Sequence, residues 1–197
     1  MTRVVRMLTA LASFALIGLF IAPVWRIELA APQYPERLGM RIGIGSIRGD
    51  KPDDIDNING LNHYIGMKHI TPSAIPELRI IPWVVGGLVL FGLIAAATGR
   101  ASAVYVWLGA FTLAGVGGLV DFWKWQFDYG HSIDYAHAII KIPGMNYQPP
   151  LIGVKQMLNI TAVSWPDIGG WIALVAFVLG ASAALITFRS RPHAHAL

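Results

Sequence analysis

The chain contains no cysteine in 197 residues. Disulfide bridges, thiolate zinc sites and cysteine-ligated iron–sulfur clusters are therefore excluded. Charged side chains are also scarce, at 13% of the sequence, whereas hydrophobic residues make up 55% and the mean hydropathy is +0.55. These values lie outside the usual range of soluble globular domains. The composition indicates a membrane protein.

Charged side chains and histidines are missing altogether from four long stretches. Each stretch is about long enough to cross a hydrocarbon core roughly 30 Å thick, and only a helix satisfies its own backbone hydrogen bonds in lipid. We therefore expect four transmembrane helices. They cover Met7–Val24, Ile80–Ala97, Ala103–Val120 and Ile168–Phe188.

The remaining charges predict the topology. Arginines without accompanying acids occupy both tails and the short turn between the second and third stretches: Arg3, Arg6, Arg100, Arg189 and Arg191. The positive-inside rule places these segments in the cytoplasm. All 11 acidic residues lie in two long loops, 26–79 and 121–167, which we expect on the outer side. The predicted location is the bacterial cytoplasmic (inner) membrane, with both termini inside.

Two further interpretations concern the charge pattern. The net charge of +4 follows from this topology. We expect the lipid bilayer as a partner and no nucleic acid. The first stretch could instead be a signal peptide that is cleaved near Leu29-Ala30-Ala31. Either interpretation leaves both long loops outside the cytoplasm.

The predicted fold is an all-α membrane protein of four transmembrane helices in two hairpins, with a small mixed extracytoplasmic cap formed by the two loops. Its parts are 1–25 (first helix and cytoplasmic N-terminus), 26–79 (first outer loop), 80–123 (second and third helices), 124–167 (second outer loop) and 168–197 (fourth helix and cytoplasmic tail). Alternating apolar residues predict a strand within Met40–Arg48, with His137–Ile142 as its possible partner.

Methionine and histidine carry the only suggestion of a metal site. His63 and Met67 are four residues apart, so they share a face if the segment is helical. Neutral soft ligands of this kind suit copper outside the cytoplasm. Met145 or His131 from the second loop would complete the site. The outer loops also contain Met40, Met157, His69 and His137, and packing by the methionines is the alternative interpretation.

Other cofactors and enzymatic activity are less favoured. Trp123, Trp125, Tyr129 and His131 could border a haem or quinone, but cofactors in helix bundles usually require histidine within the helices. Asp121, at the end of a span, is expected at the membrane interface and does not predict an ion path. Hydrolase and phosphate-loop motifs are absent from the sequence, so we expect no catalytic residues.

Several short sequence segments resemble those of a family of poorly characterised bacterial membrane proteins whose genes lie near those for nitrous-oxide reductase maturation. The segments are Ala31-Pro32-Gln33-Tyr34-Pro35, residues 57–67 (NINGLNHYIGM), Val120-Asp121-Phe122, Pro143-Gly144-Met145 and residues 147–153 (YQPPLIG). The resemblance implies an accessory role in which the protein delivers copper or electrons to nitrous-oxide reductase, or helps its maturation factors assemble it. The alternative is a non-catalytic structural subunit of a larger membrane complex.

Overall fold

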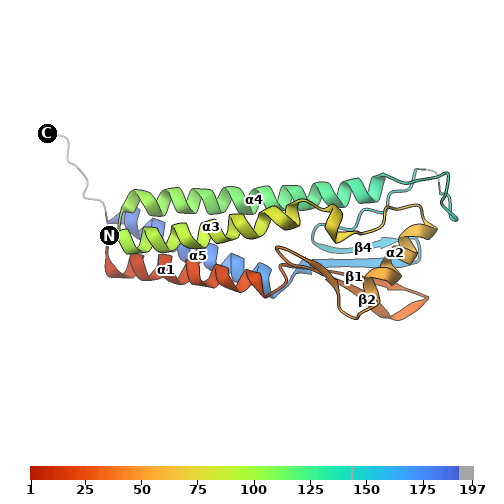
Figure 1. The fold of residues 1–197 in the computed structure, drawn as a ribbon, viewed down its shortest axis with the longest axis horizontal. Helices are drawn as coiled ribbons and strands as arrows, with labels where there is room; N and C mark the ends of the chain where they lie inside the picture. Colours follow the sequence, from red (N-terminus) through yellow and green to blue (C-terminus); the bar gives the residue numbers. More distant parts are fainter. Residues whose placement is uncertain (143, 191–197) are drawn as a thin grey trace.

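The computed structural model describes residues 1–142 and 144–190; Pro143 and residues 191–197, including Arg191 of the predicted tail, lie outside the described residues. Four long helices form a bundle with a sheet domain at one end (Figure 1). All four are long and apolar enough to cross a membrane, which confirms the four predicted helices. They are α1 (Arg3–Ile17), continued by a 3-10 turn at Gly18–Phe20, α3 (Glu77–Thr98), α4 (Ala101–His131) and α5 (Ile168–Arg189).

The start of α1 and the end of α5 lie at the bundle end that is remote from the sheet (Figure 1). The turn between α3 and α4 lies at the same end, where Gly99 adopts a φ of 67° and ends α3. Arg6 donates hydrogen bonds to the carbonyls of Ala96 (2.8 Å) and Ala97 (2.6 Å). A cation in this position satisfies carbonyls that the helix end leaves without partners.

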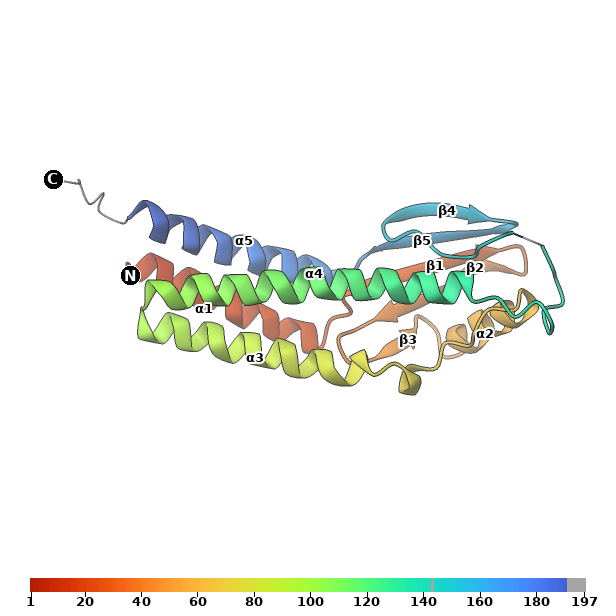
Figure 2. The same cartoon turned by 90° about the horizontal axis from the view of Figure 1, so that it is seen from above.

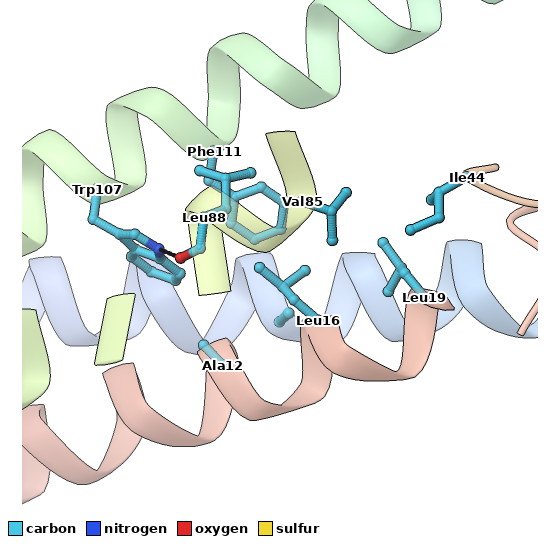
Figure 3. Packing of buried hydrophobic residues seen from close by; sticks show 9 residues of the cluster. Ala12, Leu16, Leu19, Ile44, Val85, Leu88, Trp107 and Phe111 are labelled. Atoms are coloured by element: carbon cyan, nitrogen blue, oxygen red, sulfur yellow. Dashed lines mark hydrogen bonds between the residues drawn. The ribbon is translucent and has the colours of Figure 1, made fainter. Parts of the chain in front are cut away.

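Trp107 occupies the centre of the bundle. Its side chain is fully buried, and its Nε1 donates to the carbonyl of Leu88 at 2.9 Å (Figure 3). Leu16, Val85 and Phe111 belong to the same buried cluster. Small residues give the indole its space: a Cβ added at Gly92 or Gly180 would lie within 2.6 Å of it. Close helix packing in membranes depends on such positions.

The domain outside the bundle is built on a five-stranded antiparallel sheet, so the chain as a whole is not all-α, although the cap is mixed as predicted. Its strands are β1 (Trp25–Ala31), β2 (Tyr34–Ile42), β3 (Ile47–Gly49), β4 (Gly153–Met157) and β5 (Ile160–Pro166), in the order β3-β2-β1-β5-β4. The central β1–β5 pair joins the two long loops. The predicted shared cap is therefore one continuous sheet with α2 (Asp54–Tyr64) packed on it.

The predicted strands differ from the observed ones. Residues 40–48 contain the end of β2, a turn and the start of β3, because Gly43 and Gly45 interrupt the alternation. Residues 137–142 form no strand. Instead, the amides of Ile139 and Ile140 both donate to the carbonyl of Tyr64, at 3.1 and 2.9 Å, so this segment covers the end of α2. The β4–β5 hairpin turns at Leu158, which has a φ of 56°.

Helix α4 connects the bundle to the sheet domain. It has 31 residues, more than a bilayer needs, and extends beyond the bundle over the sheet (Figure 2). Phe122, Trp125 and Tyr129 on its outer part pack against the buried sheet cluster that includes Ile27 and Met40. The domain is thereby fixed in position relative to the helices.

The opposite sheet face carries a network of charges centred on Asp50. Arg26 Nη2 lies 2.6 Å from Asp50 Oδ2, and Arg41 Nε donates to Asp50 Oδ1. Burial alone raises the pKa of Asp50, but the hydrogen bonds from Arg41 and Arg26 outweigh it and hold the pKa below its usual range. The ionised carboxylate therefore stabilises the pairing of the strands that carry these groups.

This network predicts sensitivity to acid. A depressed pKa contributes stability above the unfolded-state pKa, about 3.9 for Asp, and loses it as the pH falls through the lower folded-state value. We expect the free energy of unfolding to fall below about pH 4, and Asp50→Asn to weaken that dependence. Tryptophan fluorescence during denaturant unfolding across this pH range measures the effect. If the free energy of unfolding of Asp50→Asn fell as steeply at low pH as that of the unaltered protein, the prediction would be contradicted.

Candidate functional site

The predicted helical pairing of His63 with Met67 is not formed. Helix α2 ends at Tyr64, and Gly66 then takes a φ of 75°. Met67 therefore lies outside the helix and does not share a helical face with His63. The Met67 amide donates to the carbonyl of Asn62 at 2.9 Å, which folds the chain back over the helix end. Helices commonly end at a glycine with left-handed backbone angles. Here Gly66 plays that role and so determines the position of the Met67 side chain.

Asparagines of α2 hold this fold-back segment in place. The Asn59 side chain accepts from the Ile70 amide at 2.7 Å and donates to the Ile70 carbonyl at 3.1 Å. Asn62 Nδ2 donates to the carbonyl of Lys68 at 3.3 Å. The run of asparagines therefore shapes the loop, and it fixes Met67 against the domain interior.

Met67 borders a cavity of about 70 Å³ between the sheet, α2 and the outer end of α4. Two other methionines line it, Met40 from β2 and Met157 from β4. The remaining lining is mostly aliphatic and aromatic, including Ile27, Leu61, Ile65, Trp125, Tyr129 and Tyr147. Three methionines therefore line one largely apolar pocket.

Met145 lies beside the same region. With Met67 it packs against a buried cluster formed by Ile65, Tyr147, Met157 and Ala162. Two of the four residues predicted from the sequence are thus brought to one cluster, together with Met157. The local sequence carries no clear signal for this, because Met157 shares its strand face with Lys155 and Gly153, whereas the apolar Val154 lies on the other face and is exposed.

The two predicted histidines lie elsewhere. His63 is exposed, and its ring centroid is 6.3 Å from that of His69, almost perpendicular to it. His131, also exposed, stacks on Phe127 at 3.9 Å, with Nδ1 3.0 Å from the Phe127 carbonyl. Among residues 1–142 and 144–190, no group of three or more histidines and acids is arranged to hold a metal ion.

Two buried oxygen atoms on residues that line the cavity have no hydrogen-bond partner among the described residues. They are Gln126 Oε1 on α4 and the hydroxyl of Tyr147. Gln126 is fully buried, and only its Nε2 is used, donating to the Pro150 carbonyl at 3.4 Å. Burial raises the pKa of Tyr147, so its hydroxyl is neutral at ordinary pH. Buried polar atoms usually have a partner, so these two oxygens are exceptions among the described residues.

No family model matches this chain, and no curated protein matches it. The chemistry of the cavity and of the exposed histidines is therefore the basis for considering function.

Proposed function

We propose that this chain is an integral membrane accessory protein of copper-dependent nitrous-oxide respiration that binds Cu(I) in its outer domain. In this proposal the membrane is the bacterial inner membrane, the sheet domain is periplasmic and both termini are cytoplasmic. The observation that supports it most is the cavity lined by Met40, Met67 and Met157. Thioethers are neutral, soft ligands that select Cu(I) over hard cations.

The size and polarity of the cavity favour a bare ion. A dry cavity of about 150 Å³ is needed to hold benzene, whereas this one measures about 70 Å³ and is too small for a haem or quinone ring. A monovalent cation in an apolar enclosure needs polar atoms nearby. Gln126 and Tyr147 line the cavity, and each carries a buried oxygen without another partner among the described residues.

The exposed histidines offer a second pair of ligands on the surface of the domain. His63 and His69 form a pair of imidazoles at the end of α2, where the helix dipole favours a cation. Met67 lies between them in sequence and borders the cavity. We infer that copper is captured at the surface pair and held at the methionines before transfer to nitrous-oxide reductase or one of its maturation factors.

Titration of the purified full-length protein with Cu(I) against a competing chelator tests the proposal. We expect the Met67→Leu/Met157→Leu variant to bind at least about tenfold more weakly, because leucine keeps the volume and removes both sulfurs. Met7→Leu is the matched control, since Met7 is an exposed methionine of α1. It should bind like the unaltered protein.

Two outcomes would contradict the proposal. Equal affinity in the unaltered protein and the double methionine variant would show that the thioethers serve packing alone. That result, with no bound copper in protein purified from its native membrane, would favour the structural-subunit alternative. A loss of affinity only in His63→Ala/His69→Ala would move the site to the surface pair.

A further inference from the structure

Three arginines lie side by side on the sheet face opposite the methionine-lined cavity (the methionine cavity). In the strand register, Arg41 of β2 lies directly between Arg26 of β1 and Arg48 of β3. The three alternate along their strands with residues such as Met40 and Ile47, which are buried on the inner face. We call these three residues the arginine row.

The arginine row lies where the sheet meets the bundle. Two of its members flank the turn between β2 and β3, and this turn reaches the outer end of α3. Ile44 of the turn belongs to the buried cluster of the bundle, and a Cβ added at Gly45 would lie 3.1 Å from Pro82 Cγ. Trp83, next to Pro82, is 83% exposed, which suits a membrane interface. With the apolar bundle in the membrane, the row therefore lies at the depth of the lipid headgroups.

Carboxylates compensate the charge at one end of the row. Asp50 pairs with Arg26 at 2.6 Å and also with Arg41. Glu28 pairs with Arg26 at 3.0 Å and with Arg37 at 3.3 Å. Arg26 and Arg41 thus belong to the charge network of the sheet face, and the positive charge that is open to another partner lies toward β3.

Arg48, at the β3 end of the row, has no carboxylate partner. It forms no ion pair with any described residue, and its Nε reaches only Ser46 Oγ, at 3.4 Å. Glu28 of β1 and Asp167, which follows β5, lie at least two strands from β3, or roughly 10 Å. Glu36 lies at the opposite end of β2. The acids of this sheet face therefore leave Arg48 uncompensated.

Arg41 and Arg48 form a pair of donors that a ligand can reach. They are directly opposite each other in the β2–β3 register, where like charges destabilise a sheet. Each uses only its Nε among the described residues, and both are exposed, with 43% of the Arg41 side chain accessible. The Nη nitrogens of both guanidinium groups can therefore donate to one anion. Phosphate oxygens suit such a pair, because they accept charge-assisted hydrogen bonds from guanidinium groups.

We propose that Arg41 and Arg48 bind the phosphate of an anionic phospholipid such as phosphatidylglycerol. The phosphate oxygens accept from the Nη groups of both arginines, and the negative charge relieves the repulsion between them. Phosphatidylethanolamine and phosphatidylcholine carry an ammonium group, which would bring a further cation beside Arg48 and weaken their binding. The depth of the arginine row favours a lipid phosphate over a dissolved one. This site is independent of copper binding.

Native mass spectrometry of the full-length protein in detergent, with equimolar phosphatidylglycerol, phosphatidylethanolamine and phosphatidylcholine, tests this site. We expect one retained phosphatidylglycerol, enriched at least about tenfold over each of the others. Arg48→Gln should remove the enrichment. Arg48→Lys keeps the charge but not the paired donors, so it should keep part of the enrichment. Because Arg48 is exposed, neither substitution should change the thermal midpoint of the protein.

Arg37→Gln is the matched control. Arg37 is another arginine of β2 with an exposed side chain, 58% accessible, but it lies toward the end of the sheet that is remote from the bundle. This variant should retain phosphatidylglycerol normally. Equal retention of the three lipids by the unaltered protein, or undiminished enrichment in Arg48→Gln, would overturn the proposal. Displacement of phosphatidylglycerol by millimolar inorganic phosphate would also overturn it, because the site would then bind phosphate without the lipid.

Discussion

Gly92→Leu is expected to prevent the helix bundle from packing. A Cβ at this position of α3 would overlap Ser13 Oγ of α1 and lie 2.6 Å from Trp107 Nε1 of α4. The indole has little room to move aside, because it is fully buried and its opposite edge packs on Gly180 of α5. Overpacking of a filled core costs about 3 kcal/mol when no relaxation is possible. A leucine, which also adds a branched side chain, should exceed that cost.

The measurement is the midpoint of thermal aggregation in detergent, followed by fluorescence-detected size exclusion. Gly87→Leu is the control on the same helix, because Gly87 is exposed and nothing lies within 4 Å of its added Cβ. It should run as a monodisperse peak at the unaltered midpoint. A Gly92→Leu protein as stable as this control would refute the described position of Trp107.

Gly130→Val is expected to detach the segment 144–151 from α4. An added Cβ would overlap the backbone amide and Cα of Gln148, and backbone atoms of a bonded segment cannot rotate away. The Tyr147 amide donates to the Gly130 carbonyl at 2.9 Å, and this contact would be lost. Since Tyr147 and Pro149 line the methionine cavity, the change would also open the cavity to water.

Hydrogen exchange of peptides that cover 144–151 measures the detachment. We expect about 100-fold faster exchange, which corresponds to about 3 kcal/mol. Gly60→Ala is the control on α2: Gly60 is exposed and has no neighbour within 4 Å, and alanine should stabilise the helix by about 0.5–1 kcal/mol. Unchanged protection of 144–151 in Gly130→Val would contradict the described docking of the segment.

The four helices could be predicted because lipid leaves the backbone few choices. Uninterrupted apolar stretches must be helical in a bilayer, so periodicity and capping hardly matter there. The ends were less predictable. Helix α4 continues to His131, eleven residues past Val120, where the predicted stretch ended, since Phe122, Trp125 and Tyr129 find a packing surface on the sheet.

The sheet could not be predicted from local patterns. Strand β1 follows a membrane helix almost at once, and its partner β5 precedes another. Trp25 Nε1 donates to Ser164 Oγ at 2.8 Å across a separation of 139 residues. Pairing at such separation depends on the bundle bringing the two loops together, and no short-range signal encodes it.

The candidate site was partly predictable for the same reason. Three of the outer-loop methionines named from the sequence, Met40, Met67 and Met157, border one cavity. The specific His63–Met67 pairing assumed a helix that Gly66 ends. Which methionines meet is decided by the strand register, in which Met157 pairs with Ile160.

The pairing of β1 with β5 has a consequence for biosynthesis. The ribosome finishes β1 early and β5 only near the end of the chain, so β1 and β2 must wait for their central neighbour. At typical elongation rates this delay is roughly 7–30 s. During that time an unpaired strand edge stands at the membrane surface. The open edge of β1 is therefore a site where the nascent hairpin can aggregate until β5 pairs with it.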